Sequence, residues 1–263
     1  MKATVNGNEF RYTVTGSGPW VTLSHSLACR LEMWDEEIAR LSKRFTVLAY
    51  DSRGHGESGA PARDYTLDEI ASDIKGLYDH LGIGESHWIG LSMGGVFGLA
   101  AALRYPGIFT SMVLADTSSK LAPEGIAAFK DRVAKVRAGH SMEPMVDLTL
   151  KRWFKDSFRA KSPALMERVA QWIRTTPAEG YCGTSAAIPT IDVTTKLHEI
   201  EVPVLVLVGA DDIAMPVAFS ETLVKHLPNA ELVVIPDAGH LSNLEQPEAF
   251  NAALESFYNR IGV

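Results

Sequence analysis

The chain has 263 residues, of which 46% are hydrophobic and 22% are charged. This composition is close to the globular average, so it excludes a disordered, collagen-like or disulfide-stapled protein and allows one large α/β domain. The 25 Lys and Arg residues against 32 Asp and Glu residues give a net charge of −7, which argues against a general affinity for nucleic acid or anionic membrane. Cys29 and Cys182 provide no disulfide framework, as is typical of a reducing compartment.

No segment of the sequence is typical of secretion or of a membrane span. The first seven residues lack the apolar stretch of a secretory signal. The uncharged run at residues 89–103 contains several glycines and a serine, and it is shorter than the roughly 18 apolar residues of a spanning helix. We therefore expect a cytoplasmic protein with neither a membrane nor a nucleic-acid partner.

Short β-branched or aromatic runs alternate with helix-like segments over the first 116 residues. The predicted strands are residues 9–14, 20–24, 45–50, 87–90 and 111–115, and the predicted helices are residues 31–42, 67–81 and 93–104. After residue 202 the alternation returns, with strands at 204–208 and 232–235 and helices at 218–226 and 248–258. Apolar strands that alternate with helices indicate an α/β fold with a mostly parallel sheet, covered by helices on both faces.

Residues from about 120 to 200 break this alternation. They are predicted to form consecutive helices, at residues 124–137, 142–154, 163–175 and 178–188, with no strong strand between them. An all-helical insertion in such a fold most simply forms a cap over the face where the loops after the strands emerge. We therefore divide the chain into an α/β core, residues 1–119 and 201–263, and a helical cap, residues 120–200.

The most informative motif is Gly90-Leu91-Ser92-Met93-Gly94-Gly95. It fits the pattern G-x-S-x-G and lies between a predicted strand and a helix rich in small residues. At such a turn the serine adopts a strained backbone and its hydroxyl stands above the sheet, beside a helix N-terminus that favours an oxyanion. A Gly-rich turn that serves only helix–sheet packing fits the pattern alone, but the context indicates a nucleophile.

A nucleophilic serine needs a base to take its proton and a third group to orient that base. Among the eight histidines, His240 follows the strand at residues 232–235 and so lies at the carboxyl edge of the sheet, where open α/β folds bind ligands. His25 and His55 lie in loops at the same edge, and we interpret both as histidines that brace their loops. Asp211 and Asp212 follow the strand at residues 204–208, and only one of them is expected to face His240.

An oxyanion formed on the substrate needs two N–H donors. Met93 directly follows the serine and is predicted to supply one. The other is expected from the segment Ser24-His25-Ser26-Leu27, with Leu27 as the donor. The sequence contains no H-E-x-x-H or C-x-x-C motif, no G-x-G-x-x-G after the first strand and no Walker-type loop, so we predict neither a metal nor a cofactor.

Together these motifs resemble those of the α/β-hydrolase superfamily over essentially the whole chain. The order Ser92, Asp212, His240 is the order expected of that family. Its G-x-x-D pattern places the acid on Asp212 rather than on Asp211. The other matching segments are residues 24–27, 51–58 and 239–240, of which 51–58 is usually scaffolding. The resemblance implies an α/β-hydrolase fold in which Ser92, Asp212 and His240 form a catalytic triad.

Within the superfamily the chain is most similar to the 3-oxoadipate enol-lactone hydrolases of aromatic degradation. The similarity rests on residues 24–27, 33–34, 151–154, 179–181 and 240–245. It implies a small-molecule substrate, a lactone with a free carboxylate, and no cofactor. Arg152 beside Trp153 is then a candidate clamp for that carboxylate, although an arginine on the solvated face of a cap helix explains the same residue.

The leading hypothesis is a serine hydrolase that opens a small lactone or ester through an acyl-enzyme on Ser92. A general carboxylesterase, a perhydrolase or a lactam hydrolase needs the same three residues and differs only in its pocket. Dehalogenases and epoxide hydrolases need an aspartate in place of Ser92, and Leu91 counts against carbon–carbon bond hydrolases, which often carry Asn before the serine. A ligand receptor that turns over slowly is the alternative from another class.

Overall fold

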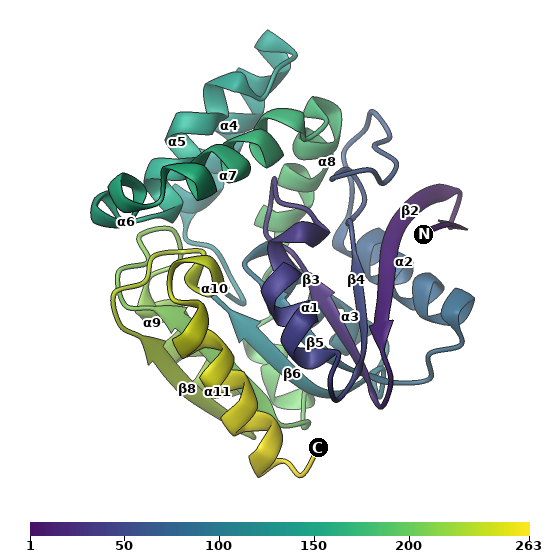
Figure 1. Ribbon diagram of the computed structural model, residues 1–263. Coiled ribbons are helices and arrows are strands. Elements are labelled where there is room, and N and C mark those ends of the chain that lie inside the picture. Colours follow the sequence, from purple (N-terminus) through teal and green to yellow (C-terminus); the bar gives the residue numbers. More distant parts are fainter.

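An eight-stranded sheet runs through the centre of the computed structural model, which describes residues 1–263 (Figure 1). The strand order is β1-β2-β4-β3-β5-β6-β7-β8. The pairs β1–β2 and β2–β4 are antiparallel, and every pair from β4 to β8 is parallel. The strands are β1 (Lys2–Val5), β2 (Asn8–Gly16), β3 (Trp20–Ser24), β4 (Thr46–Tyr50), β5 (Ser86–Leu91), β6 (Phe109–Ala115), β7 (Val204–Gly209) and β8 (Ala230–Ile235).

The central strands are buried on both faces. Every residue of β5 and β7 is buried, as expected of parallel strands with helices on either side. Along β7, Leu205 and Leu207 join one hydrophobic core while Val204 and Val206 join the other, because successive side chains of a strand point to opposite faces. The expected mostly parallel α/β architecture is confirmed.

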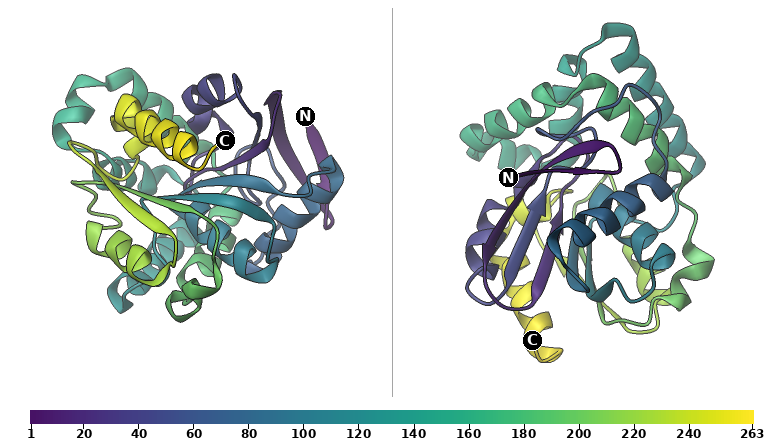
Figure 2. Two further views of the ribbon diagram at one scale, coloured as in Figure 1. Left: turned by 90° about the horizontal axis from the view of Figure 1, so that it is seen from below. Right: turned by 90° about the vertical axis from the view of Figure 1, so that its right-hand side faces the viewer.

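Helices cover the two faces of the sheet, as the view from below shows (Figure 2). The helices on one face are α2 (Leu67–Leu81), α3 (Met93–Arg104) and α9 (Val217–His226), and those on the other are α1 (Asp35–Leu41) and α11 (Pro247–Arg260). Helix α2 begins at a capping box, in which Thr66 and Glu69 satisfy each other's backbone N–H groups, and it ends at Gly82 with φ +69°. No helix combines the length and the apolar character that crossing a membrane requires.

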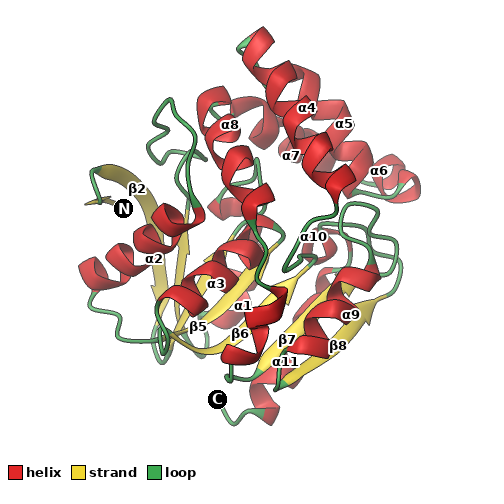
Figure 3. Ribbon diagram, turned by 180° about the vertical axis from the view of Figure 1, so that it is seen from behind, coloured by secondary structure: helices red, strands yellow, loops and turns green.

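Five helices stand over the carboxyl edge of the sheet (Figure 3). They are α4 (Pro123–Gly139), α5 (Glu143–Trp153), α6 (Asp156–Lys161), α7 (Pro163–Thr175) and α8 (Ala178–Ala187). Two short 3₁₀ helices, η2 (Ile188–Thr190) and η3 (Thr194–Glu199), lead back to the core. Buried apolar residues of α5 and α7, such as Met145 and Ile173, belong to the same core as Val21 in β3. We call residues 120–200 the cap.

The short elements η2, η3 and α10 (Ser242–Glu245) were not predicted, and three further differences have a clear local cause. Strand β1 is absent from the prediction, but Asn6 and Gly7 both have positive φ and form the tight turn that pairs it with β2. The helix predicted at residues 31–42 divides into η1 (Leu31–Trp34) and α1, and the Leu31 N–H is bonded to the Asp51 carboxylate at 2.8 Å. Helix α6 was not predicted because its six residues include no buried one and so give no apolar period.

Candidate active site

Ser92 lies at the sharp turn between β5 and α3, with φ +53° and ψ −109°. Its N–H donates to the Ala115 carbonyl at 2.8 Å, and the Thr117 hydroxyl donates to the Ser92 carbonyl at 2.7 Å, so both peptide groups of the turn are held. A Cβ at Gly90 would lie 2.2 Å from the Gly94 oxygen, which excludes a larger residue there. The glycine of the motif therefore lets α3 leave the sheet close to the strand.

His240 lies on the loop between β8 and α10 (Ser242–Glu245). Its Nε2 is 2.9 Å from Ser92 Oγ, and its Nδ1 is 2.8 Å from Asp212 Oδ2. The His240 N–H donates to the carbonyl of Trp153, at the end of cap helix α5, over 2.8 Å. The structure thus brings together the three residues predicted at 92, 212 and 240, and the cap helps to hold the imidazole.

The Asp212 carboxylate is buried and held in one orientation. Its Oδ1 accepts the N–H groups of Ala214 at 2.7 Å and Met215 at 2.9 Å. Burial alone raises the pKa of this carboxyl, but His240 and the two N–H donors outweigh it and leave the pKa below its usual value. An ionised Asp212 only accepts, so His240 Nδ1 carries the proton and Nε2 accepts from the Ser92 hydroxyl. Asp211 instead pairs with Lys155 at 2.6 Å.

A second buried carboxyl, Asp116, connects the loops that carry the acid and the base. It follows β6, its Oδ1 accepts the Gly209 N–H at 2.8 Å, and its Oδ2 lies 2.5 Å from Ser242 Oγ. Gly209 begins the loop of Asp212, and Ser242 follows His240 by two residues. Burial, and then the charge of Asp212, raises the pKa of Asp116 well above its usual range. Asp116 therefore favours its neutral form.

The loop after β3 forms another wall of the site. The N–H groups of Leu27 and Met93 donate to no acceptor within the protein, and both residues line the space in front of Ser92. The buried His25 donates from Nδ1 to the Ser26 carbonyl at 2.7 Å and accepts the Ser52 N–H at Nε2 over 3.0 Å. Burial lowers the pKa of His25 to about 4 and that of the neighbouring His55 to about 3, so both are neutral braces in the loops.

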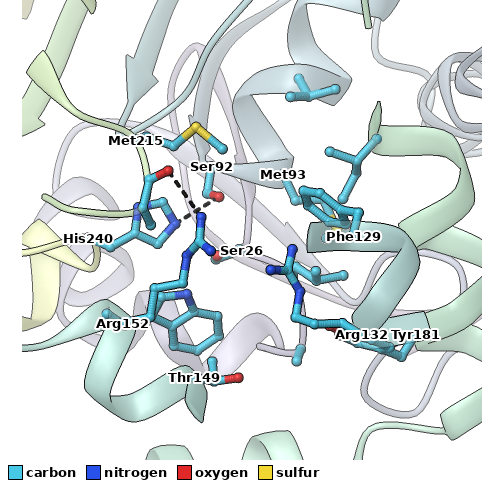
Figure 4. Close-up of a pocket in the computed structure, with 16 residues that line it drawn as sticks. Ser26, Ser92, Met93, Phe129, Arg132, Thr149, Arg152, Tyr181, Met215 and His240 are labelled. Atoms are coloured by element: carbon cyan, nitrogen blue, oxygen red, sulfur yellow. Dashed lines mark hydrogen bonds between the residues drawn. The ribbon is translucent and has the colours of Figure 1, made fainter. Parts of the chain in front are cut away.

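A small cavity of about 60 Å³ lies in front of Ser92, between the core and the cap (Figure 4). Trp153 and Arg152 both line it, and the centre of the Trp153 ring lies 6.2 Å from that of His240. The guanidinium of Arg152 donates to the Ala214 carbonyl at 3.3 Å and points into the cavity in Figure 4. The lining residues are Ser26, Leu27, Ala28, Ser92, Met93, Val96, Phe129, Arg132, Thr149, Arg152, Trp153, Tyr181, Ile188, Ala214, Met215 and His240.

Comparison with known proteins identifies the family to which the chain belongs. The sequence model of the alpha/beta hydrolase fold matches residues 19–247, which is most of the chain. The chain belongs to the α/β hydrolase family. This membership, together with the relatives below, confirms the expected fold class and identifies the chain as a hydrolase.

Individual members of the α/β hydrolase family match almost end to end. 3-Oxoadipate enol-lactonase 2 of Acinetobacter baylyi is 35% identical over 92% of this chain and 89% of its own. The crystal structure of the enol-lactonase from Burkholderia xenovorans LB400 is 35% identical, covers 98% of this chain and 100% of its own, and has a TM-score of 0.94. A protein of Pseudomonas syringae with the provisional name carbamate hydrolase RutD is 31% identical over 95% of this chain and 97% of its own. The predicted resemblance to the enol-lactonases is confirmed.

Two residues of this hydrolase were missed by the sequence analysis. Arg132, on α4, lines the cavity from the side opposite to Arg152 (Figure 4), but no motif surrounds it in the sequence. Asp116 follows a predicted strand and precedes the cap, as residues of the carboxyl edge do. Asp116 could have been predicted from this position alone, since residues at the carboxyl edge of parallel strands converge on one site.

Proposed function

We propose that this α/β hydrolase opens a small lactone or ester through an acyl-enzyme on Ser92. The observation that carries the proposal is the pair of contacts made by His240, 2.9 Å to the Ser92 hydroxyl and 2.8 Å to the Asp212 carboxylate. A base within hydrogen-bond reach of a hydroxyl, itself oriented by a buried carboxylate, is the arrangement that activates a serine. In this proposal Ser92, His240 and Asp212 are the catalytic residues.

The first half-reaction forms the acyl-enzyme. His240 Nε2 takes the Ser92 proton as Oγ attacks the acyl carbon, and Asp212 stabilises the imidazolium that results. The oxyanion of the tetrahedral intermediate accepts the unpartnered N–H groups of Leu27 and Met93, which form the proposed oxyanion hole. His240 then gives its proton to the oxygen of the breaking carbon–oxygen bond, so the ring opens and the acyl group stays on Ser92.

The second half-reaction releases the acid. His240 removes a proton from a water molecule, whose oxygen attacks the acyl carbon, and the same two N–H groups hold the second oxyanion. The bond to Ser92 Oγ breaks, and His240 returns the proton to that oxygen. The water has then supplied one oxygen of the new carboxyl group, and Ser92 is regenerated.

The proposed substrate is a lactone with a free carboxylate, as in 3-oxoadipate enol-lactone of aromatic degradation. Two observations support it: the relatives named as enol-lactonases, and a cavity lined by arginines, among them Arg152 beside the aromatic wall of Trp153. An arginine can bind a carboxylate through two parallel hydrogen bonds. The named carbamate hydrolase relative makes carbamate hydrolysis on the same three residues the second candidate.

The nucleophile is tested by replacing Ser92 with alanine. We expect Ser92→Ala to lower kcat for an enol-lactone or a p-nitrophenyl ester by about 10⁴-fold or more, because no other group can form the acyl-enzyme. Ser72→Ala, in α2 and outside the cavity lining, is the matched control and should retain the wild-type rate. An unchanged rate in Ser92→Ala would refute the mechanism, and a single stoichiometric burst in the wild type would identify a slow receptor instead.

The substrate class is tested by comparing kcat/KM for 3-oxoadipate enol-lactone, a neutral lactone, a neutral ester and a carbamate. The proposal expects the anionic lactone to be the best of the four. A higher value for the carbamate would favour the second candidate, and a higher value for the neutral ester would identify a general carboxylesterase.

A further inference from the structure

Two arginines face each other across the cavity in front of Ser92. Arg152 extends from α5 and Arg132 from α4, and both line the same space. Figure 4 shows the Arg152 guanidinium on the side of Ser92 and His240, and the Arg132 guanidinium on the side of Phe129 and Tyr181. A cavity that is otherwise mostly apolar therefore contains two positive charges on different sides.

Neither of these arginines has an acidic partner. Ten arginines of the chain have a carboxylate within 4.0 Å. Only Arg44, Arg132, Arg152 and Arg168 do not, and two of these four line the cavity. A surface arginine without a partner is unremarkable because water solvates it, but both cavity arginines are half-buried.

The contacts that these guanidinium groups do make include no carboxylate within 4.0 Å, and the charge of Asp212 acts on Arg152 only from a longer distance. Arg152 donates to the Ala214 carbonyl at 3.3 Å, and Arg132 lies over the Phe129 ring at 4.3 Å, beside the buried hydroxyl end of Tyr181. Burial, and then the like charge of Arg132, lowers the pKa of Arg152. Two cations that repel each other in a half-buried space favour the binding of anions between them.

We propose that Arg132 and Arg152 form a two-cation site that binds a dicarboxylate, with Arg132 on the carboxylate that the lactone already carries and Arg152 on the carboxylate formed by hydrolysis. The inference rests on the proposed function, and it moves the lactone's own carboxylate from Arg152, the clamp expected from the sequence, to Arg132. The carbon attacked by Ser92 becomes the new carboxyl group, so this group forms on the side of the cavity where Arg152 lies. The free carboxylate then lies on the side of Arg132.

The chemistry of ring opening explains why two cations are useful. Water adds one oxygen to the acyl carbon, the ring oxygen leaves with a proton as an enol that becomes a ketone, and the new acid loses its proton. A substrate with one negative charge thus gives a product with two. Arg132 is then the specificity-determining residue for the substrate anion, and the whole site should bind a linear dicarboxylate more tightly than a monocarboxylate.

The test measures binding without turnover, by calorimetry with adipate and with hexanoate, which have equal chain length but two and one carboxylates. For the wild type we expect adipate to bind about tenfold or more tightly than hexanoate, since each charge-assisted contact adds to affinity. Arg132→Gln and Arg152→Gln should each lower the affinity for adipate about tenfold and remove the preference. Arg168→Gln is the matched control, because this cap arginine also lacks a carboxylate partner but is exposed and lies over Trp172 outside the cavity.

Equal binding of adipate and hexanoate by the wild type would overturn the inference, and so would unchanged adipate binding in Arg132→Gln. Activity separates this failure from a failure of the proposed function. If the wild type hydrolyses the lactone and Ser92→Ala does not, while adipate shows no preference, the serine mechanism stands and the two-cation site does not. In kinetic assays, Arg132→Gln should raise KM for the anionic lactone and leave KM for a neutral ester nearly unchanged.

Discussion

A single buried carboxyl can position a catalytic pair without touching the substrate. Asp116 has a left-handed backbone, with φ +48°, and is completely buried. One of its oxygens contacts Gly209, which begins the loop that carries Asp212. The other contacts Ser242, which follows His240 by two residues. In its neutral form Asp116 accepts at one oxygen and shares a proton with Ser242 at the other, so it adds no second negative charge beside Asp212.

This role predicts that an amide can replace the acid. In Asp116→Asn the carbonyl oxygen still accepts from Gly209 and the NH₂ group donates to Ser242, so we expect kcat and stability close to the wild type. Asp116→Ala leaves a buried N–H and a buried hydroxyl without partners and should lower the free energy of unfolding by about 1–3 kcal/mol for each. It should also lower kcat more than it changes KM, because the two loops lose their connection. Urea unfolding and steady-state kinetics measure both effects, and an Asn variant as impaired as the Ala variant would contradict a neutral Asp116.

The residues of the candidate site differ in how far the sequence predicts them. Ser92, Asp212 and His240 each follow a predicted strand, and parallel strands bring such positions to one edge whatever the packing details. Arg132 lies on a cap helix, where the side chains that face the cavity depend on how the helix docks. Periodicity predicts that α4 is a helix, but it does not predict its orientation over the sheet.

At the scale of elements, the cap rests on the core through a contact between two backbones. Helix α8 crosses the loop at residues 51–58, and a Cβ on Gly180 would lie 2.1 Å from the Gly54 carbonyl oxygen. Gly54 itself has φ +82°, in the region that favours glycine. About one turn further along α8, the Gly183 carbonyl accepts a hydrogen bond from the Tyr65 N–H at 3.1 Å. This close approach fixes the position of α8, the helix whose Tyr181 lines the cavity.

Replacing Gly180 with alanine should therefore displace α8. Because the obstructing atom belongs to the backbone of Gly54, the helix must move, and we expect Gly180→Ala to lower the free energy of unfolding by about 1–3 kcal/mol. KM for the substrate should rise with little change in kcat, since Tyr181 lines the cavity and the Ser92–His240 contact lies elsewhere. Gly125→Ala in α4 is the matched control, because its nearest neighbour would be Leu121 at 3.8 Å and alanine favours a helix. Equal stability of the Gly180→Ala variant and the wild type in urea would contradict this account of the contact.

The alternation of strands and helices predicts the order of elements well but not the way in which the cap closes. The apolar runs of β5 and β7 identify central parallel strands, whereas β1 has only four residues and α6 has no buried face. At the scale of the whole molecule, the cavity lies between the core and the cap, so its shape depends on how the cap docks onto the core. This docking is a property of the folded molecule that no local pattern contains.

The stability of the whole molecule also depends on a buried acid outside the active site. Glu37, on α1, is 1% exposed, its Oε1 accepts from Asn251 of α11 at 3.4 Å, and Asn243 of α10 is a second hydrogen-bonding neighbour. Burial, and to a smaller extent the charge of Glu36, raises the pKa of Glu37 to about 8. Since this pKa is higher in the folded chain than the value of 4.5 for an exposed glutamate, the folded state binds this proton more tightly than the unfolded state.

Linkage then fixes the direction of the pH dependence. The contribution of Glu37 is fully present below pH 4.5 and declines as the pH rises to about 8, where the folded chain must also release the proton. Glu37→Gln keeps the shape of the neutral acid without a titrating proton, so its stability relative to the wild type should increase steadily between pH 4.5 and 8. Urea unfolding at several pH values measures this difference, with the exposed Glu85→Gln as the control that should follow the wild type. A constant difference between Glu37→Gln and the wild type over this range would show that Glu37 is already ionised in the folded protein, and the α1–α11 contact would then have to hold a buried charge.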